Sequence, residues 1–178
     1  MKLLRTIRLD PSDGFVFRIA AAPGEWAICG TFLFADTDFA GLTGKDLAAF
    51  RSGFLGVPSL GWSTLAQVVE VDDADRRAAI DAAARCFLER LGAPDAAAAR
   101  QAATEEIEFA ASLCDHPADT LIALHRRAEG GTIRESFRQL RPRPGAPPRR
   151  VFDFSAAVED DEPGETVDLA RLARGESA

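Results

Sequence analysis

The sequence predicts one α+β domain, an antiparallel sheet of about six strands with a two-helix hairpin packed on one face. Two observations carry this expectation. Residues 63–71 form a β-branched run whose apolar side chains alternate in direction, which is the period-two pattern of a buried strand. Directly after this run, two segments repeat apolar residues every three or four positions, as consecutive amphipathic helices do.

The two helices have recognisable start and stop signals. Acidic residues at 72–75 supply oxygens that cap free N–H groups, so the first helix is expected to begin near Ala74. Gly92 closes it, Pro94 suits the first turn of the second helix, and Pro117 stops that helix. So short a connection makes the helices antiparallel. The apolar face of the first helix comprises Ile80, Ala84, Phe87, Leu88 and Leu91.

The first part of the chain has the alternation of an antiparallel meander. Strands are expected at 2–9, 15–20 and 26–34, with one strongly aromatic face that suits the helical hairpin. Pro23 and Gly24 match the central pair of a type II turn between the last two.

The segment 132–140 permits two interpretations. Gly130 and Gly131 between apolar runs indicate a β-hairpin with the strand expected at 120–127. Thr132 followed by Glu135 also fits a helix capping box. We favour the hairpin slightly.

The C-terminal part changes composition. Residues 141–150 contain four prolines and are expected to form an extended linker, followed by an edge strand at 151–154. The sequence therefore predicts a single α+β domain over residues 1–154. A flexible acidic tail is expected over residues 155–178.

Composition predicts the cellular setting. The chain has 178 residues, 47% of them hydrophobic and 28% charged, as in ordinary globular proteins. No apolar run approaches the roughly 20 residues of a membrane span, and the N-terminus lacks the apolar core of a signal peptide. We therefore expect a cytoplasmic protein with no membrane partner. Cys29, Cys86 and Cys114 lie in apolar patterns, which indicates buried, reduced thiols.

The net charge of −7 is divided unevenly. Residues 1–125 hold 11 basic and 18 acidic residues, 126–150 hold 8 and 2, and 151–178 hold 2 and 8, so these blocks carry −7, +6 and −6. An acidic whole opposes general binding to nucleic acid, so no nucleic-acid partner is expected. The arginine-rich block favours a local anion.

Two groups of residues are candidate binding sites. An anionic partner or ligand is expected at Arg126, Arg127, Arg134 and Arg138, because guanidinium groups bind phosphate and carboxylate with paired donors. The alternative without a specific ligand is that these arginines form a solvated face that attracts the acidic tail. The glycine-rich segment 36–62, with a short helix at 45–51, is a candidate docking surface or lid through Phe50, Phe54 and Trp62. The alternative is that these rings close one end of the core.

Catalytic and metal-binding patterns are weak. Cys114 precedes Asp115 and His116, an arrangement that can activate a thiol, yet adjacent residues point in different directions and Cys114 lies on an apolar stripe. Catalytic residues are therefore left unknown. Recognisable metal-ligand spacing is missing, so we expect no metal and no cofactor.

A family resemblance joins several of these segments. The run 105–116, continuing into 120–125 and 133–138, resembles an uncharacterised bacterial family of unknown function. The likeness covers about the C-terminal half of the chain. It implies no activity and no catalytic residue.

These observations favour a small cytoplasmic accessory or protein-interaction protein without catalysis of its own. A protein partner is expected, and the formation of homo-oligomers is left open. The alternative is a small-molecule-binding domain or enzyme, with residues 36–62 as a lid and arginines that hold an anionic ligand. A concave site between this segment and the sheet would favour the alternative.

Overall fold

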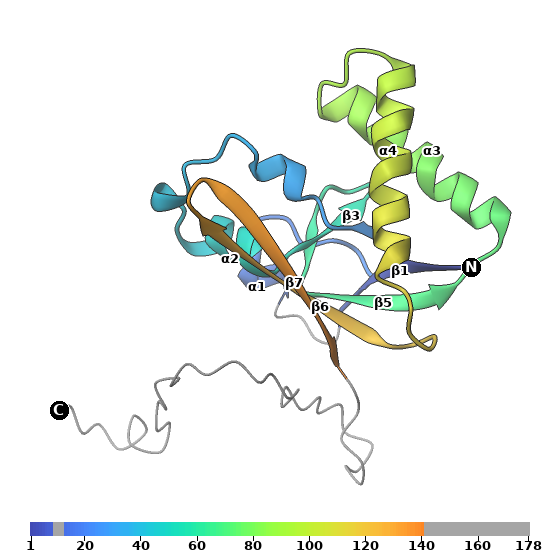
Figure 1. The fold of residues 1–178 in the computed structure, drawn as a ribbon, viewed down its shortest axis with the longest axis horizontal. Helices are drawn as coiled ribbons and strands as arrows, with labels where there is room; N and C mark the ends of the chain where they lie inside the picture. Colours follow the sequence, from blue (N-terminus) through green and yellow to red (C-terminus); the bar gives the residue numbers. More distant parts are fainter. Residues whose placement is uncertain (9–12, 141–178) are drawn as a thin grey trace, which may run out of the picture.

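The computed structural model describes residues 1–8 and 13–140, which an antiparallel sheet organises (Figure 1). The sheet has seven strands within these residues, one more than the sequence predicted. The strands are β1 (Lys2–Ile7), β2 (Trp26–Ile28), β3 (Phe54–Val57), β4 (Trp62–Ser63), β5 (Leu65–Glu70), β6 (Leu121–Glu129) and β7 (Thr132–Leu140). Their spatial order is β4-β3-β2-β1-β5-β6-β7, and every neighbouring pair is antiparallel.

Helical segments connect the strands. They are α1 (Asp13–Val16), α2 (Gly44–Ser52), α3 (Asp73–Arg90), α4 (Ala96–Ser112) and two 3₁₀ turns, η1 (Thr31–Phe34) and η2 (Phe39–Gly41). The start of α3 carries the expected cap, because the Asp75 amide donates to the Asp72 carboxylate at 2.8 Å. Gly92 follows α3 at a φ of +76°, the left-handed conformation that its sequence position predicted.

Residues of α3, α4 and the sheet share the largest apolar core. Figure 1 shows the two helices lying against each other. Ala79, Ala83 and Cys86 are buried on α3, whereas Leu88 is 42% exposed and was wrongly assigned to the apolar face. Alanines at the contact between α3 and α4 let the two helices approach closely. The buried face of α3 therefore includes Ala79 and Ala83 instead of Leu88.

The predicted N-terminal meander is confirmed only in part, as β1 and as the short β2. Residues 15–20 do not form a strand; α1 includes Phe15, whose side chain is 78% exposed. The strand expected over 26–34 ends at Ile28, because Gly30 adopts a φ of +69° and starts η1. A Cβ at Gly30 would lie 2.7 Å from the Leu55 Cβ, so only glycine allows this close approach.

The segment 36–62 divides into a surface part and a sheet part. Helix α2 confirms the helix expected at 45–51. Strands β3 and β4 were missed because both are very short, and they place Phe54 in the core at 0% exposure. Phe54 therefore lies within the sheet, whereas residues 36–52 precede its strand β3.

The hairpin interpretation of 132–140 is confirmed. Strand β7 pairs with β6 over their full lengths, and Gly130 and Gly131 take φ values of +57° and +82° at the turn. A type I′ turn requires positive φ at both central positions, which explains the two glycines. The linker, the edge strand expected at 151–154 and the acidic tail lie outside the described residues. Among the helices that the structure describes, none is long and apolar enough to span a membrane.

Candidate functional site

A buried arginine connects the β6–β7 hairpin to the end of α2 and to the residues that follow β2. Arg126 is 1% exposed, and its Nη1 donates to the carbonyls of Phe50 and Gly53, both at 3.0 Å. These carbonyls belong to the last turn and C-cap of α2, where a helix leaves acceptors free and favours positive charge. Nη2 donates to the carbonyl of Cys29, just after β2. One side chain therefore joins β6, α2 and β2.

The remaining donor of Arg126 enters a side-chain network. Its Nε donates to Thr31 Oγ1 at 2.8 Å and to Glu135 Oε1 at 3.0 Å, and the Thr31 hydroxyl donates to the same carboxylate. Strand register explains the ion pair, because Arg126 and Glu135 are direct cross-strand neighbours. Burial lowers the pKa of Arg126, and the charge of Glu135 opposes that effect. A guanidinium stays protonated in proteins, so the cluster holds a fixed positive charge.

Glu106 of α4 belongs to the same network. The Gly30 amide donates to its carboxylate, while its Oε2 is buried without a hydrogen-bond partner among the described residues. Burial raises the pKa of Glu106, the Gly30 hydrogen bond lowers it, and the nearby charge of Glu135 raises it again. The folded protein therefore holds this carboxyl group with a pKa above its ordinary value.

A cavity of about 590 Å³ lies beside Arg126, between the β6 tip and the segment that precedes β3. We call it the arginine cavity. Its apolar wall includes Phe39, Leu47 and Phe50, and its polar wall includes Arg51, His125 and Arg127. Figure 1 shows the hairpin tip on the same side of the molecule as α2, in agreement with the contacts between α2 and β6. The hydrogen bonds of Arg126 to α2 thus set the width of the cavity.

His125 lies at the centre of the positive groups. Its Nε2 accepts a hydrogen bond from Arg127 Nε at 3.2 Å, so a neutral imidazole would carry its proton on Nδ1. Burial lowers the pKa of His125, and three neighbouring charges lower it further, those of Arg127, Arg138 and Arg51. Ion-pair contacts between these three arginines and a carboxylate are missing within the described residues. The site is therefore electropositive, because its carboxylate, Glu129, does not balance the positive charge of these arginines.

The predicted arginines divide between the two faces of the hairpin. Arg127 lies opposite Arg134 and, like Arg138, is exposed on the face that includes His125, whereas Arg126 points to the other face. Arg134 is ion-paired with Glu129 at 2.8 Å. The four side chains therefore do not form one surface, and Arg126 supports the site from behind it.

The predicted aromatic residues also take different places. Phe50 lines the arginine cavity, Phe54 lies within the sheet, and the half-buried Trp62 packs on Phe34 with ring centroids 5.4 Å apart. Sequence reasoning missed Arg51 and His125 as site residues. The alternation of buried residues along β6 could have shown that Arg126 points inward and His125 outward.

Comparison with known proteins identifies the family. The model of a family of unknown function, DUF6505, matches residues 1–147. The chain belongs to this family. No curated protein and no solved structure matches it. The DUF6505 match extends well beyond the C-terminal half and includes every residue of the arginine cavity, whereas the acidic residues after 158 lie outside it.

In this DUF6505 member, the side chains of Cys114 and His116 bind different partners. Cys114 is buried, its Sγ donates to the Ala110 carbonyl at 3.3 Å, and burial raises its pKa to about 11. The side-chain amide of Gln139 contacts the ring of His116, with 2.6 Å between Gln139 Nε2 and His116 Nδ1. Cys29 and Cys86 are also buried, and burial raises the pKa of both thiols. Within the described residues, no three His, Cys, Asp or Glu side chains converge as metal ligands do.

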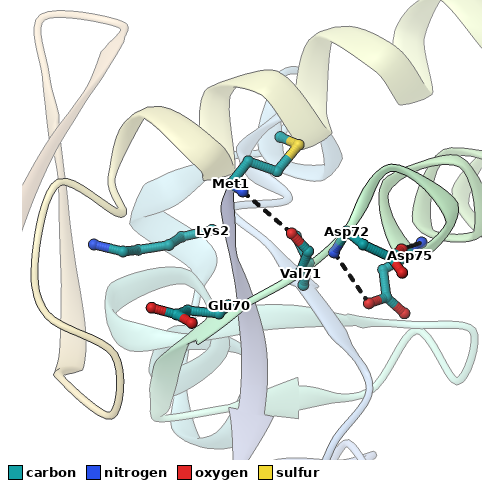
Figure 2. A pocket seen from close by; sticks show the side chains of 6 residues that line it. All are labelled: Met1, Lys2, Glu70, Val71, Asp72 and Asp75. Atoms are coloured by element: carbon teal, nitrogen blue, oxygen red, sulfur yellow. Dashed lines mark hydrogen bonds between the residues drawn. The ribbon is translucent and has the colours of Figure 1, made fainter.

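A second cavity, of about 510 Å³, lies where β1 begins and β5 ends (Figure 2). Most of its polar groups have structural partners. The N-terminal ammonium donates to the Val71 carbonyl at 3.2 Å, and Asp72 and Asp75 form the cap of α3. Lys2 lies on the side of Glu70 in Figure 2, and its Nζ donates to the His116 carbonyl at 2.6 Å. We assign no ligand to this cavity.

The role of Arg126 as a structural tie predicts a large loss of stability on its removal. Arg126→Met leaves Glu135 and several carbonyls without their donor, so the free energy of unfolding should fall by about 3–5 kcal/mol in urea denaturation. Its neighbour Arg127→Met, which is exposed, should change that free energy by about 0.5 kcal/mol or less. A loss below about 1 kcal/mol for Arg126→Met would contradict the assigned role.

Replacing Glu106 by glutamine should increase the stability of the fold in a pH-dependent way. Because its pKa is raised in the folded state, ionisation of Glu106 destabilises the fold as pH rises through that pKa, and no penalty exists below the unfolded value. Glu106→Gln should therefore melt at a higher temperature than the original protein at about pH 7.5 and at the same temperature at about pH 4. Glu105→Gln is the control, because Glu105 is exposed. Equal effects of both substitutions at pH 7.5 would refute the explanation.

Proposed function

We propose that the protein binds a small organic anion in the arginine cavity. The observation that carries the proposal is the position of this cavity, where the two candidate segments of the sequence meet. Residues 39–50 supply its apolar wall, and Arg51 with the end of β6 supplies its cationic wall. A concave, mostly apolar site with a few convergent polar groups is the usual form of a ligand-binding site.

Electrostatics supports an anionic ligand. Arg127 and Arg134 are direct cross-strand neighbours, and like charges in that position destabilise a hairpin by about 0.2–1 kcal/mol. Glu129 offsets only Arg134 through its ion pair. An anion between Arg51 and Arg127 would relieve the remaining repulsion. The charge of Arg126, behind the wall, is already balanced by Glu135, so the excess positive charge belongs to Arg51 and Arg127.

The segment 36–52 is the part of the predicted lid that takes this role. It begins after η1, includes η2 and α2, and presents Phe39 and Leu47 to the cavity. The Asp38 carboxylate accepts a hydrogen bond from the Ala40 amide at 3.1 Å and so shapes the start of this wall. In the proposal, these residues cover the apolar part of the ligand and exclude water from it.

An accessory protein that docks a protein partner in the cytoplasm, without catalysis of its own, is the second candidate function. It is favoured by exposed apolar and cationic side chains that do not line the cavity. Phe15 and Ile19 are 78% and 56% exposed, and the edge strand β7 carries the exposed Arg138. Gel filtration separates the two candidates, because a stable hetero-complex would favour docking. A homo-oligomer would appear in the same measurement.

The proposal includes the predicted packing of the α3–α4 pair as a hairpin on one face of the sheet. The shared core of Ile80, Ile107 and Val68 supports this arrangement. Helices on that face would leave the opposite face of the β6–β7 hairpin, with His125 and Arg127, accessible to a ligand.

Sulfate provides the test of anion binding, because it does not titrate between about pH 5 and 8. Bound sulfate should raise the pKa of His125, measured from its Cε1–H resonance, because an anion offsets the nearby positive charges. By linkage, sulfate should bind more tightly at about pH 5.5 than at pH 7.5 at constant ionic strength. His125→Gln should remove this pH dependence.

Matched charge reversals locate the site. Arg51→Glu combined with Arg127→Glu should abolish the response of the His125 resonance to sulfate. Arg77→Glu combined with Arg85→Glu changes the net charge equally on exposed positions of α3 and should leave the response intact. The proposal fails if His125 does not respond to sulfate or if both pairs of substitutions act equally.

A further inference from the structure

The apolar wall of the arginine cavity contains aromatic rings that pack against each other at an angle. The Phe39 and Phe50 rings lie 4.8 Å apart at an interplanar angle of 42°, and Phe50 packs against Phe34 in turn. Leu47 adjoins them. Rings held by such contacts form a rigid surface that favours a flat apolar group through ring packing. The wall is therefore suited to the body of a ligand rather than to its charged head.

The opposite wall offers more positive charge than one carboxylate would neutralise. Arg51 of α2 and Arg127 of β6 line this wall, whereas Arg138 of β7 lies outside the lining, and the charges of all three lower the pKa of His125. The acidic residue at the cavity, Glu129, already pairs with Arg134 at 2.8 Å. Two guanidinium forks and an imidazole N–H match the several oxygens and the double charge of a phosphate group.

We propose that the ligand of this site is an organic phosphate monoester with a flat, aromatic or similarly apolar body. The inference rests on the proposed function, because it names the class of anion that the cavity takes. The phosphate group lies between Arg51 and Arg127 beside His125, and the body lies against Phe39 and Leu47. The cavity volume of about 590 Å³ falls within the range of roughly 300–1,000 Å³ that small-molecule sites have.

The experiment compares three probes by isothermal titration calorimetry at about pH 7.5, using the full chain. Phenyl phosphate has both parts of the ligand, inorganic phosphate has only the head, and benzoate has a ring with a single charge. Phenyl phosphate should bind at least about tenfold more tightly than either of the others, because only it uses both walls. The His125 and Phe39 resonances should move together on its addition.

Variants at exposed positions test the two walls separately. Arg127→Gln should weaken phenyl phosphate at least about tenfold, whereas Arg77→Gln on α3 should not change its affinity. Ala40→Trp fills the apolar side of the cavity and should also weaken phenyl phosphate at least about tenfold. Ala78→Trp, on the exposed face of α3, is its matched control.

A phosphorylated tyrosine side chain in a protein offers the same chemistry as phenyl phosphate. The acetylated and amidated phosphotyrosine therefore forms a fourth arm of the titration. A free small molecule as ligand predicts that this compound binds no more tightly than phenyl phosphate. Binding at least about tenfold tighter would overturn a small molecule as the source and assign the site to a modified protein.

Different results would overturn anion binding and the inferred class of ligand. If inorganic phosphate or benzoate binds at His125 as tightly as phenyl phosphate, the inferred ligand class is wrong and anion binding stands. If no probe, sulfate included, moves the His125 resonance, the proposed function fails and the inference fails with it. Equal losses of affinity in Ala40→Trp and Ala78→Trp would also overturn the inferred place of the aromatic body.

Discussion

The rest of the structure depends on one buried cation, the guanidinium of Arg126. Three separate parts of the chain supply its acceptors, and the Glu135 carboxylate balances its charge. A buried ion pair gives little net stability relative to apolar packing, but it fixes geometry, because a displaced partner leaves a charge without compensation. Here the fixed geometry is the approach of the β6 tip to the end of α2, and this approach forms the arginine cavity.

The alternation of a β-strand lets neighbouring arginines do different work. Arg126 points inward and holds the hairpin in place, while Arg127 and His125 point outward into the positive surface. All three nitrogens of the inner guanidinium donate hydrogen bonds within the protein, so its position is fixed. In the proposed function, the outer residues bind the anion, so structural support and recognition fall on successive positions of one strand.

Much of the fold could be predicted because its signals are local. The cap at Asp72, the glycine after α3 and the two glycines of the β6–β7 turn each act within a few residues, and the structure confirms them. The end of β2 could not be predicted, because it depends on the contact of Gly30 with Leu55. Strands β3 and β4 are too short to show a period.

The candidate site was predicted only in part, for a related reason. Arginine-rich composition and a glycine-rich segment pointed to the two regions that line the arginine cavity, but composition does not say which side chains are inside. Arg51 and His125 are 74 positions apart, and only the closure of the hairpin onto α2 brings them to one cavity. Amide and side-chain hydrogen exchange reports that closure most directly. In ¹⁵N spectra, the Nε–H of Arg126 should exchange with solvent at least about a hundredfold more slowly than those of Arg127 and Arg138, because only a buried, hydrogen-bonded donor is protected. Equal exchange rates for the three guanidinium groups would contradict the account.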